Sequence, residues 1–345
     1  MNIASLISKY DPENQYDVLL NYHEQIKSAW YRDMSLTPDL IRADFSSIII
    51  SGMGGSAISG NLFRNFCQKD LRLPLTIVRN YRLPSHAGEN TLLIVSSYSG
   101  NTEETIATLK EGIEKKCKIV CLTTGGKIME IAAQNSLTCV PLFPGFQPRF
   151  SIGQSFFTLL KLCQTLKLIP DQTEIVEKLT KMWKEKSEEY GSYNEELLSQ
   201  AIAILGRHVL IFSASDTTDS AGMRLKGQLN ENSKKMAYHN EYPELNHNEI
   251  ISFECIENPG AFVVVNLLDS SYNERIKKRF EITNSLISAK GIEVVEVESF
   301  QSSYKERLLD LILKIDWLSY YAAILAKKDP SEIDYIHYLK NELTR

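Results

Sequence analysis

The chain has 345 residues, of which 43% are hydrophobic and 23% are charged, and its formal net charge is −5. This length can supply two cores of ordinary size and the composition is that of a globular protein, whereas a dedicated nucleic-acid-binding protein usually carries a basic surplus. The N-terminus lacks a signal-peptide pattern and no apolar segment reaches the roughly 20 residues that span a bilayer, so we expect no membrane association.

In chain order, the hydrophobic pattern first predicts a helix over 11–34 and then a series of strand–helix units. Strands are expected at 45–50, 75–78, 91–96, 118–123 and 138–142, with helices following the first and third of them. Strands that alternate with helices form a mostly parallel sheet with helices on both faces.

A second series of this kind follows a helical connector at 153–198. Strands are expected at 209–213, 262–267 and 292–297, and helices at 219–229, 272–289 and 303–327, with a short last helix ending at 343. We therefore predict two similar α/β domains. Residues 1–152 contain the N-terminal helix and the first sheet, and residues 153–345 contain the connector, the second sheet and the C-terminal helices.

The first of two informative loops is Gly52-Met53-Gly54-Gly55-Ser56, which leaves a strand and enters a helix. Glycine lets the backbone approach a ligand closely, and a helix N-terminus offers N–H groups and the positive end of a dipole to an anion. The alternative interpretation is a glycine-rich turn that binds nothing. The spacing matches neither the dinucleotide fingerprint nor the Walker A loop.

The second loop, residues 96–105, also leaves a strand and enters a helix. Asn101 and Glu104 on their own fit a helix-capping arrangement. Capping leaves the hydroxyl groups around Gly100 unexplained, however, and these can donate hydrogen bonds to phosphate oxygens while the helix dipole supplies a positive field. Two such loops in one domain predict a phosphate site.

A polar connector in the second domain carries Glu231, in Asn-Glu-Asn-Ser-Lys, and His247, in Pro-Glu-Leu-Asn-His-Asn-Glu. No hydrophobic periodicity explains either residue. A carboxylate and an imidazole are the groups that a proton-transferring enzyme needs. Glu231 could instead be a solvated residue at the end of a helix, and His247 could be structural.

The two loops together resemble the sugar-isomerase (SIS) domain, which binds phosphosugars in enzymes and in transcription factors that only sense the sugar. Over nearly the whole chain, the motifs around Arg149, Glu231, His247 and Lys340 resemble, in the same order, those of the bifunctional phosphoglucose/phosphomannose isomerases. The resemblance implies two SIS-type, doubly wound parallel-sheet subdomains (Rossmann-like, flavodoxin-like) with flanking helices, and a homodimer.

The resemblance also implies roles for individual residues. Glu231 is expected to move the proton between C1 and C2 of the sugar, and Arg149 to stabilise the enediolate. His247, contributed across the dimer interface, and Lys340 are expected to assist ring opening. The expected phosphate ligands are Gly55, Ser56, Ser97, Ser99 and Thr102.

The implied activity is aldose–ketose isomerisation of glucose 6-phosphate, and of mannose 6-phosphate, to fructose 6-phosphate through a cis-enediolate, with no metal or other cofactor. The alternative is a non-catalytic phosphosugar sensor, and an aminotransferring isomerase would need a further domain for which the chain has no room. Residues 331–334 read Ser-Glu-Ile-Asp, where the family often has small and hydroxyl residues, so acceptance of both aldoses stays open.

Other residues have plainer expected roles. The six cysteines are scattered, and Cys117 and Cys121 flank a strand segment in a poor arrangement for zinc, so a reduced, cytoplasmic setting is expected. Lys340 lies on a polar terminal helix, where a lysine is by default a solvated charge. The aromatic residues Trp317, Tyr320 and Tyr321 are expected in the core or at a dimer contact. The other five histidines have no motif support.

Overall fold

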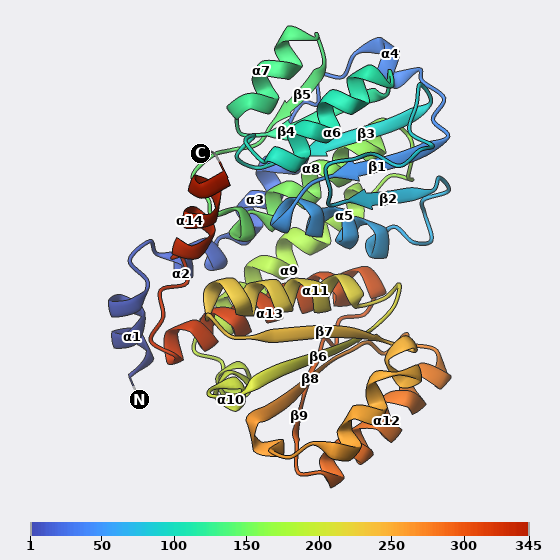
Figure 1. Ribbon diagram of the computed structural model, residues 1–345. Helices are drawn as coiled ribbons and strands as arrows, with labels where there is room; N and C mark the ends of the chain where they lie inside the picture. Colours follow the sequence, from blue (N-terminus) through green and yellow to red (C-terminus); the bar gives the residue numbers. More distant parts are fainter. Residues whose placement is uncertain (1, 344–345) are drawn as a thin grey trace. The chain divides into compact units, whose positions relative to one another are not determined.

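The computed structural model describes residues 2–343, which divide into two compact units (Figure 1). The N-terminal unit is Tyr22–Lys181, and the C-terminal unit comprises the chain up to Asn21 and from Met182 onward. The units therefore do not divide at residue 152: residues 153–181 belong with the first sheet, and the segment before Tyr22 belongs with the second.

The N-terminal unit contains a five-stranded parallel sheet with the strand order β2-β1-β3-β4-β5. Its elements are α3 (Tyr22–Trp30), α4 (Pro38–Ile41), β1 (Ser47–Ser51), α5 (Gly54–Phe66), β2 (Leu75–Val78), β3 (Thr91–Ser96), α6 (Glu103–Glu114), β4 (Lys118–Thr123), α7 (Gly126–Gln134), β5 (Thr138–Pro141), η1 (Pro148–Phe150) and α8 (Ile152–Thr165). The following α9 (Thr173–Gly191) continues along the chain into the C-terminal unit.

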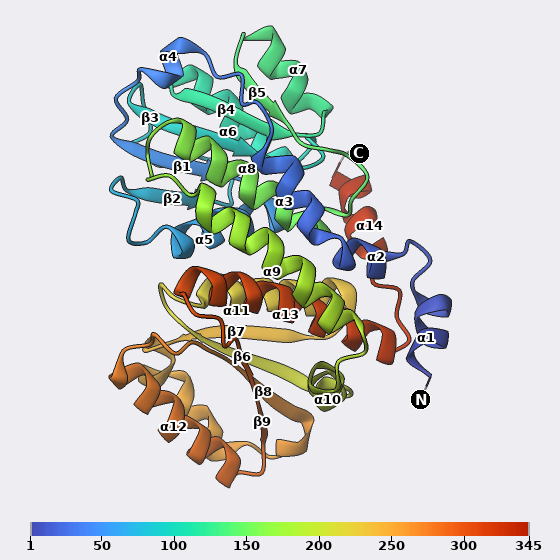
Figure 2. The same ribbon diagram turned by 180° about the vertical axis from the view of Figure 1, so that it is seen from behind.

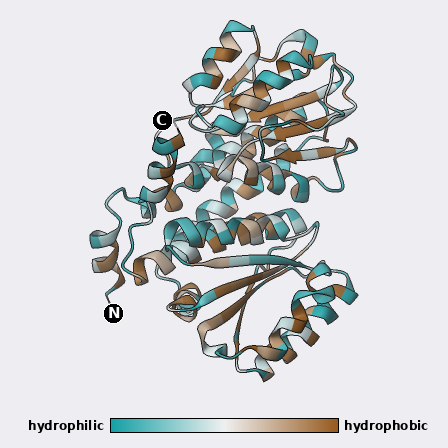
Figure 3. Cartoon of the chain, in the orientation of Figure 1, coloured by the Kyte–Doolittle hydropathy of each residue, from teal (hydrophilic) through white to brown (hydrophobic). Residues whose placement is uncertain are grey.

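Helices cover both faces of this sheet because both faces are apolar. Every residue of β1 and β3 is buried, as expected for strands of an all-parallel sheet. Ile49, Leu93 and Cys121 pack under α6 and α7, whereas α5 approaches Ile50 on the opposite face. Helices α3 and α8 are in front in Figure 2, and the strands appear in hydrophobic colours in Figure 3. The expected doubly wound fold is confirmed.

The C-terminal unit contains a four-stranded parallel sheet with the order β7-β6-β8-β9. Its elements are α1 (Ile3–Tyr10), α2 (Gln15–Leu20), α10 (Glu195–Ile204), β6 (His208–Ala214), α11 (Asp219–Asn232), β7 (Ala237–Tyr242), η2 (Glu244–His247), η3 (Glu249–Cys255), η4 (Pro259–Ala261), β8 (Phe262–Leu268), α12 (Glu274–Ala289), β9 (Glu293–Glu298), α13 (Tyr304–Leu325) and α14 (Asp334–Leu343). Helices α11 and α13 lie on one face and α12 on the other (Figure 1).

Two expectations about the elements were wrong. The helix expected over 11–34 is two helices, α2 and α3, which are separated at Asn21, and a further helix, α1, precedes them. Strand β7 was not expected, because its sequence, Ala-Tyr-His-Asn-Glu-Tyr, is mostly polar (Figure 3). It is an edge strand, so only one of its sides pairs with a neighbour.

The aromatic residues of α13 lie in the core, as expected. Trp317 is fully buried and its ring lies 5.3 Å from the ring of Tyr16 in an edge-to-face arrangement. The hydroxyl of Tyr320 donates to Asp11 at 2.9 Å. These contacts attach the first residues of the chain to the C-terminal unit.

Candidate functional site

The two predicted loops lie at adjoining strand ends of the N-terminal sheet. Residues 52–53 join β1 to α5 and residues 97–102 join β3 to α6, and β1 pairs directly with β3. The chain turns to opposite sides of β1 to form β2 and β3, so the carboxyl ends of β1 and β3 form the switch point of a doubly wound sheet. Such switch points are where open α/β sheets bind ligands.

Both helices that start at this switch point have N-termini without a side-chain cap. Helix α5 has Met53 and helix α6 has Thr102 at the N-cap position, and neither side chain accepts a capping hydrogen bond. Asn101 does not cap α6 either, because its side-chain oxygen accepts from the backbone N–H of Lys127 at 3.0 Å. Uncapped first turns direct N–H groups toward an anion.

The hydroxyl groups of the second loop form a small network. The hydroxyls of Ser97 and Thr102 are hydrogen-bonded at 2.9 Å, and the N–H of Gly100 donates to Ser97 Oγ at 3.2 Å. Ser97 is 2% exposed, whereas Ser99 is exposed. Ser56 follows the first loop, in the first turn of α5. Rotating hydroxyls of this kind can exchange their mutual hydrogen bonds for bonds to phosphate oxygens.

Arg149 lies beside the first loop. A Cβ atom added to Gly55 would come within 2.8 Å of the carbonyl oxygen of Pro148, so the absence of a side chain at Gly55 allows η1 to pack against the start of α5. Arg149, the next residue of η1, is only 4% exposed. The structure thus brings Arg149 and both loops to one edge of one sheet.

A third loop that the sequence analysis did not single out supports the second one. Residues 124–125 join β4 to α7, and the N–H and hydroxyl of Thr124 both donate to the carbonyl oxygen of Tyr98, at 3.0 and 2.7 Å. Gly100 has a φ of +69°, and a Cβ there would lie 1.8 Å from the carbonyl oxygen of Gly125. The Thr-Thr-Gly-Gly sequence after a strand was the available signal, since it repeats the pattern of the first loop.

Glu231 lies in the last turn of α11, in the C-terminal unit. The ammonium group of Lys234 donates to the carbonyl oxygens of Glu231 and Asn232, at 2.9 and 3.3 Å, and also to that of Asp329. A cation that bonds the last carbonyls of a helix stabilises its C-terminus. Lys234 therefore joins the helix end that carries Glu231 to the segment before α14.

A buried polar network fixes the face of α11 on which Glu231 also lies, because residues 224, 228 and 231 have the i, i+4, i+7 spacing of one helix face. The guanidinium of Arg224 forms two hydrogen bonds with the carboxylate of Asp316 on α13, at 2.7 and 2.6 Å, and both side chains are almost fully buried. Gln228 donates to the same carboxylate at 3.0 Å, and Asn232 donates to Ser319 at 3.0 Å. One turn separates each of these α11 residues from the next, so the network holds the helix in a single rotation about its axis.

His239 is a structural rather than an exposed histidine. Its Nε2 lies 2.7 Å from the hydroxyl oxygen of Ser213, and its ring fills the space left by Gly222 of α11. Burial, with a smaller effect of Lys226, lowers the pKa of His239 to about 4. The ring is therefore neutral at physiological pH.

His247 is exposed at the end of η2, which follows the carboxyl end of β7. Glu231 lies near the other end of that strand, because the side chain of Asn230 accepts from the N–H of Ala237, the first residue of β7, at 3.1 Å. At about 3.3 Å per residue, the strand separates Glu231 from His247 of the same chain by roughly 15–20 Å.

Lys340 lies in the last turn of α14 and is exposed. Helix α14 has no buried residue within the described chain. A lysine on a helix of this kind is by default a solvated charge, so the geometry adds no argument of its own for a role of Lys340 in ring opening.

The corresponding switch point of the C-terminal sheet is filled by its own side chains. The hydroxyl groups of Thr218 and Tyr272 are hydrogen-bonded, and Tyr272 donates to the carbonyl oxygen of Leu267 at 2.6 Å. Arg307 pairs with Asp269 through two hydrogen bonds of 2.9 and 3.1 Å. The second sheet therefore does not repeat the phosphate-loop arrangement of the first.

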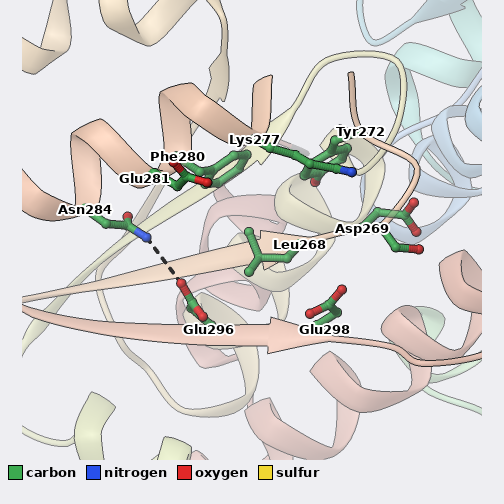
Figure 4. A pocket seen from close by; sticks show the side chains of 10 residues that line it. Leu268, Asp269, Tyr272, Lys277, Phe280, Glu281, Asn284, Glu296 and Glu298 are labelled. Carbon is green, nitrogen blue, oxygen red and sulfur yellow. Dashed lines mark hydrogen bonds between the residues drawn. The ribbon is translucent and has the colours of Figure 1, made fainter. Parts of the chain in front are cut away.

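A cavity of about 230 Å³ lies in the C-terminal unit near the ends of β8 and β9, beneath α12 (Figure 4). Its lining residues are Leu268, Asp269, Ser270, Tyr272, Lys277, Phe280, Glu281, Asn284, Glu296 and Glu298. Burial and the nearby Asp269 and Glu296 raise the pKa of Glu298. Four carboxylates against one lysine disfavour a phosphate dianion, and no predicted site residue lines this cavity.

Two other kinds of feature are absent from the described residues. No group of three or more His, Cys, Asp or Glu side chains in residues 2–343 is arranged to hold a metal ion. Within the same residues, no helix is both long and apolar enough to cross a membrane.

The chain is similar in sequence to known proteins along almost its entire length. The chain is 35% identical over 333 residues to the bifunctional phosphoglucose/phosphomannose isomerase of Caldicellulosiruptor bescii, covering 95% of this chain and 98% of that protein. It is 31% identical over 336 residues to the protein of the same name from Aquifex aeolicus, covering 96% and 99%.

Two further comparisons agree with these. Residues 194–343 match the family described as the bacterial phospho-glucose isomerase C-terminal SIS domain. A hypothetical protein of Thermus thermophilus has a similar solved structure, with a TM-score of 0.75 and 14% identity, covering 99% of this chain and 92% of that one. At this identity the structural likeness establishes the fold alone.

Proposed function

The chain belongs to the family of bifunctional phosphoglucose/phosphomannose isomerases, and we propose from this membership that it interconverts glucose 6-phosphate and mannose 6-phosphate with fructose 6-phosphate. The observation that carries the proposal in the structure is the convergence of two uncapped helix N-termini, three loop hydroxyls and the buried Arg149 at one switch point. The protein is a sugar-phosphate isomerase.

Phosphate binding is the first step of the proposed reaction. The proposed ligands are the residues expected from sequence: Gly55, Ser56, Ser97, Ser99 and Thr102. The N–H groups at the starts of α5 and α6 supply the positive ends of two helix dipoles, so no lysine is required in these loops. Binding energy from the phosphate positions the sugar for reaction at C1 and C2.

Proton transfer is the second step. His247 and Lys340 are proposed to open the sugar ring by exchanging protons with the ring oxygen and the anomeric hydroxyl. The carboxylate of Glu231 then removes the proton from C2 and returns it to C1, while a hydroxyl proton moves from O2 to O1. Arg149 offsets the negative charge of the cis-enediolate, as a preorganised cation does best in a buried setting.

The double substitution Ser97→Ala with Thr102→Ala should raise KM for fructose 6-phosphate by more than about tenfold, because hydrogen bonds to a charged group are strong. The melting temperature should change little, since both partners of the 2.9 Å hydroxyl pair are removed together. Steady-state kinetics and thermal unfolding measure the two effects. Ser46→Ala, at the opposite edge of the sheet, is the matched control. An unchanged KM would place the phosphate elsewhere.

The direct test of the activity offers the pure protein glucose 6-phosphate, mannose 6-phosphate and fructose 6-phosphate separately and identifies the products. Formation of either aldose from fructose 6-phosphate supports the proposal, and the ratio of the two aldoses reports the preference left open by residues 331–334. Binding of all three sugars without turnover would instead support the non-catalytic sensor.

We also propose that the enzyme is a homodimer in which His247 serves the partner's active site. The support is geometric: the strand β7 separates Glu231 from His247 of the same chain, and His247 is exposed. Apolar side chains of the same region are exposed as well, with Tyr238 at the start of β7 at 49% and Ile251 in η3 at 63%. A second copy would cover such residues. The cytoplasm is the proposed location.

Mixing two inactive proteins tests the shared site. After subunit exchange between His247→Ala and Glu231→Gln proteins, each hybrid dimer should contain one site with both defects and one site with neither. About half of the dimers are then hybrids, so roughly a quarter of the wild-type activity should return, because every contact occurs twice in an isologous dimer. Native mass spectrometry verifies hybrid formation. Hybrids without activity would mean that His247 serves its own chain, and a His247→Ala protein that is active before mixing would mean that His247 takes no part in the reaction.

A further inference from the structure

Tyr98, which stands between two of the predicted phosphate-binding serines, bonds through its side chain to a different part of the N-terminal unit. Its hydroxyl donates to the carbonyl oxygen of Phe143 at 2.8 Å and accepts from the N–H of Phe146 at 3.0 Å. These partners are backbone atoms of the segment 143–147, which leads directly into Arg149. One phenolic oxygen therefore connects the second loop to the residues before the arginine.

The backbone of Tyr98 is itself held firmly. Its carbonyl oxygen accepts two hydrogen bonds from Thr124, through the N–H and the hydroxyl. Its side chain is half-buried, and burial raises the pKa of the Tyr98 hydroxyl, so the group remains a neutral donor at physiological pH. Because its backbone is fixed and its hydroxyl is a neutral donor, Tyr98 can hold the segment 143–147 at a fixed position relative to the second loop.

The position of this segment determines where the side chain of Arg149 lies. Gln154 also holds Phe143, since its side chain donates to the same carbonyl oxygen at 3.1 Å and accepts from the N–H. Gln25 donates to the carbonyl oxygen of Phe150 at 2.8 Å. Arg149 lies between these two attachment points and is packed against Gly55 through its neighbour Pro148, so a shift of the segment would move its buried guanidinium.

We propose that Tyr98 is a positioning residue that couples the phosphate-binding loop to the enediolate-stabilising Arg149. The inference rests on the proposed function, since it takes its meaning from the roles given to the second loop and to Arg149. The Tyr98 hydroxyl is already hydrogen-bonded to backbone atoms of Phe143 and Phe146, so we assign it no direct contact with the substrate. Its loss should weaken the stabilisation of the transition state while leaving the ground-state contacts with phosphate intact.

The test is Tyr98→Phe, which removes one hydroxyl and two hydrogen bonds. We expect kcat to fall by about tenfold with KM within about twofold of wild type, because a small displacement of a preorganised charge reduces its effect on the transition state. Tyr31→Phe, which removes an exposed hydroxyl of the same unit, is the control and should leave both constants unchanged.

Two inhibitors distinguish a defect in the phosphate-binding loops from a displacement of Arg149. Inorganic phosphate probes the loops alone, and a phosphorylated hydroxamic acid mimics the planar, anionic cis-enediolate. In Tyr98→Phe, the inhibition constant of the hydroxamate should rise by about the same factor as kcat falls, since both depend on Arg149, while that of phosphate should stay within about twofold. An equal rise for both inhibitors would mean that Tyr98 supports the phosphate loop rather than Arg149, and unchanged hydroxamate binding would overturn the inference.

A double substitution provides an independent check. If Tyr98 acts through Arg149, then Tyr98→Phe should lower kcat by a much smaller factor in an Arg149→Lys protein than in the wild type. The reason is that the effects of neighbouring residues that act together are not additive. Full additivity would overturn the inference. Should Tyr98→Phe fold poorly, Gln154→Met removes the other attachment of Phe143 and should give the same loss confined to kcat and hydroxamate binding.

Failure of the inference and failure of the proposed function give different results. A wild-type protein without turnover refutes the function, and an Arg149→Lys variant with wild-type kcat refutes the role of the arginine. An active wild type, an impaired Arg149→Lys and an unaffected Tyr98→Phe would refute only the coupling through Tyr98.

Discussion

Glu231→Gln should lower kcat by about 10²–10⁴-fold, the range that proton transfer by a positioned side chain typically contributes. The change is nearly isosteric and removes only the basic oxygen. Glu231 is partly buried in the last turn of α11, and the substitution leaves in place the network that Arg224 and Gln228 form with Asp316 on the same face of the helix, so the fold should be retained. KM should change little because the phosphate contacts proposed for the other unit are untouched.

The measurement for Glu231→Gln is steady-state turnover of fructose 6-phosphate, with thermal unfolding as the check on folding. Glu274→Gln is the matched control, because Glu274 is an exposed carboxylate at the start of another helix of the same unit. A Glu231→Gln protein that is folded and retains turnover close to wild type would exclude Glu231 as the base.

Arg224→Met should destabilise the C-terminal unit by about 3–5 kcal/mol, the usual cost of removing one partner of a buried ion pair. The substitution leaves the carboxylate of Asp316 buried without the two hydrogen bonds that Arg224 supplies. Gln228 alone cannot compensate for a lost positive charge. The free energy of unfolding, measured from urea titration, gives the effect.

The control for Arg224→Met is Arg207→Met, which breaks an ion pair of the same chemical kind with Glu293 at the surface of the same unit. Exposed pairs contribute only about 0–1 kcal/mol, so the two substitutions should differ by several kcal/mol. The double variant Arg224→Met with Asp316→Leu should recover part of the loss, because it removes the uncompensated charge. Equal effects of the two single substitutions would contradict the structural role given to the buried pair.

Most of the fold could be predicted because its strands are short apolar runs that alternate with helices. Strands β1 and β3 are buried throughout and stand out in the sequence for that reason. Strand β7 could not be predicted in this way, because an edge strand with a mostly polar sequence has no apolar run. The single helix expected over 11–34 failed at Asn21, where the chain ends one helix and begins another although the apolar spacing continues.

The candidate site could be predicted in part. The loops around Gly54 and Gly100 carry a local signal, since glycine and hydroxyl residues follow a strand within a few positions. The approach of Arg149 to the first loop depends on Gly55 and Pro148, which are far apart in the sequence, and no local pattern encodes that contact. The same holds for the pairing of Arg224 with Asp316, a contact between residues 92 positions apart.

The most direct measurement of the central claim follows deuterium from solvent into the sugar. Fructose 6-phosphate is incubated with the wild-type protein in D2O, and the aldose products are analysed by NMR. A cis-enediolate mechanism with Glu231 as the base predicts glucose 6-phosphate, and mannose 6-phosphate where it forms, carrying deuterium at C2 in a share of the molecules. It also predicts that the Glu231→Gln protein forms product and exchanges deuterium at least about a hundredfold more slowly than the wild type. Aldose that forms without any deuterium at C2, or exchange in Glu231→Gln at a rate close to wild type, would contradict the account.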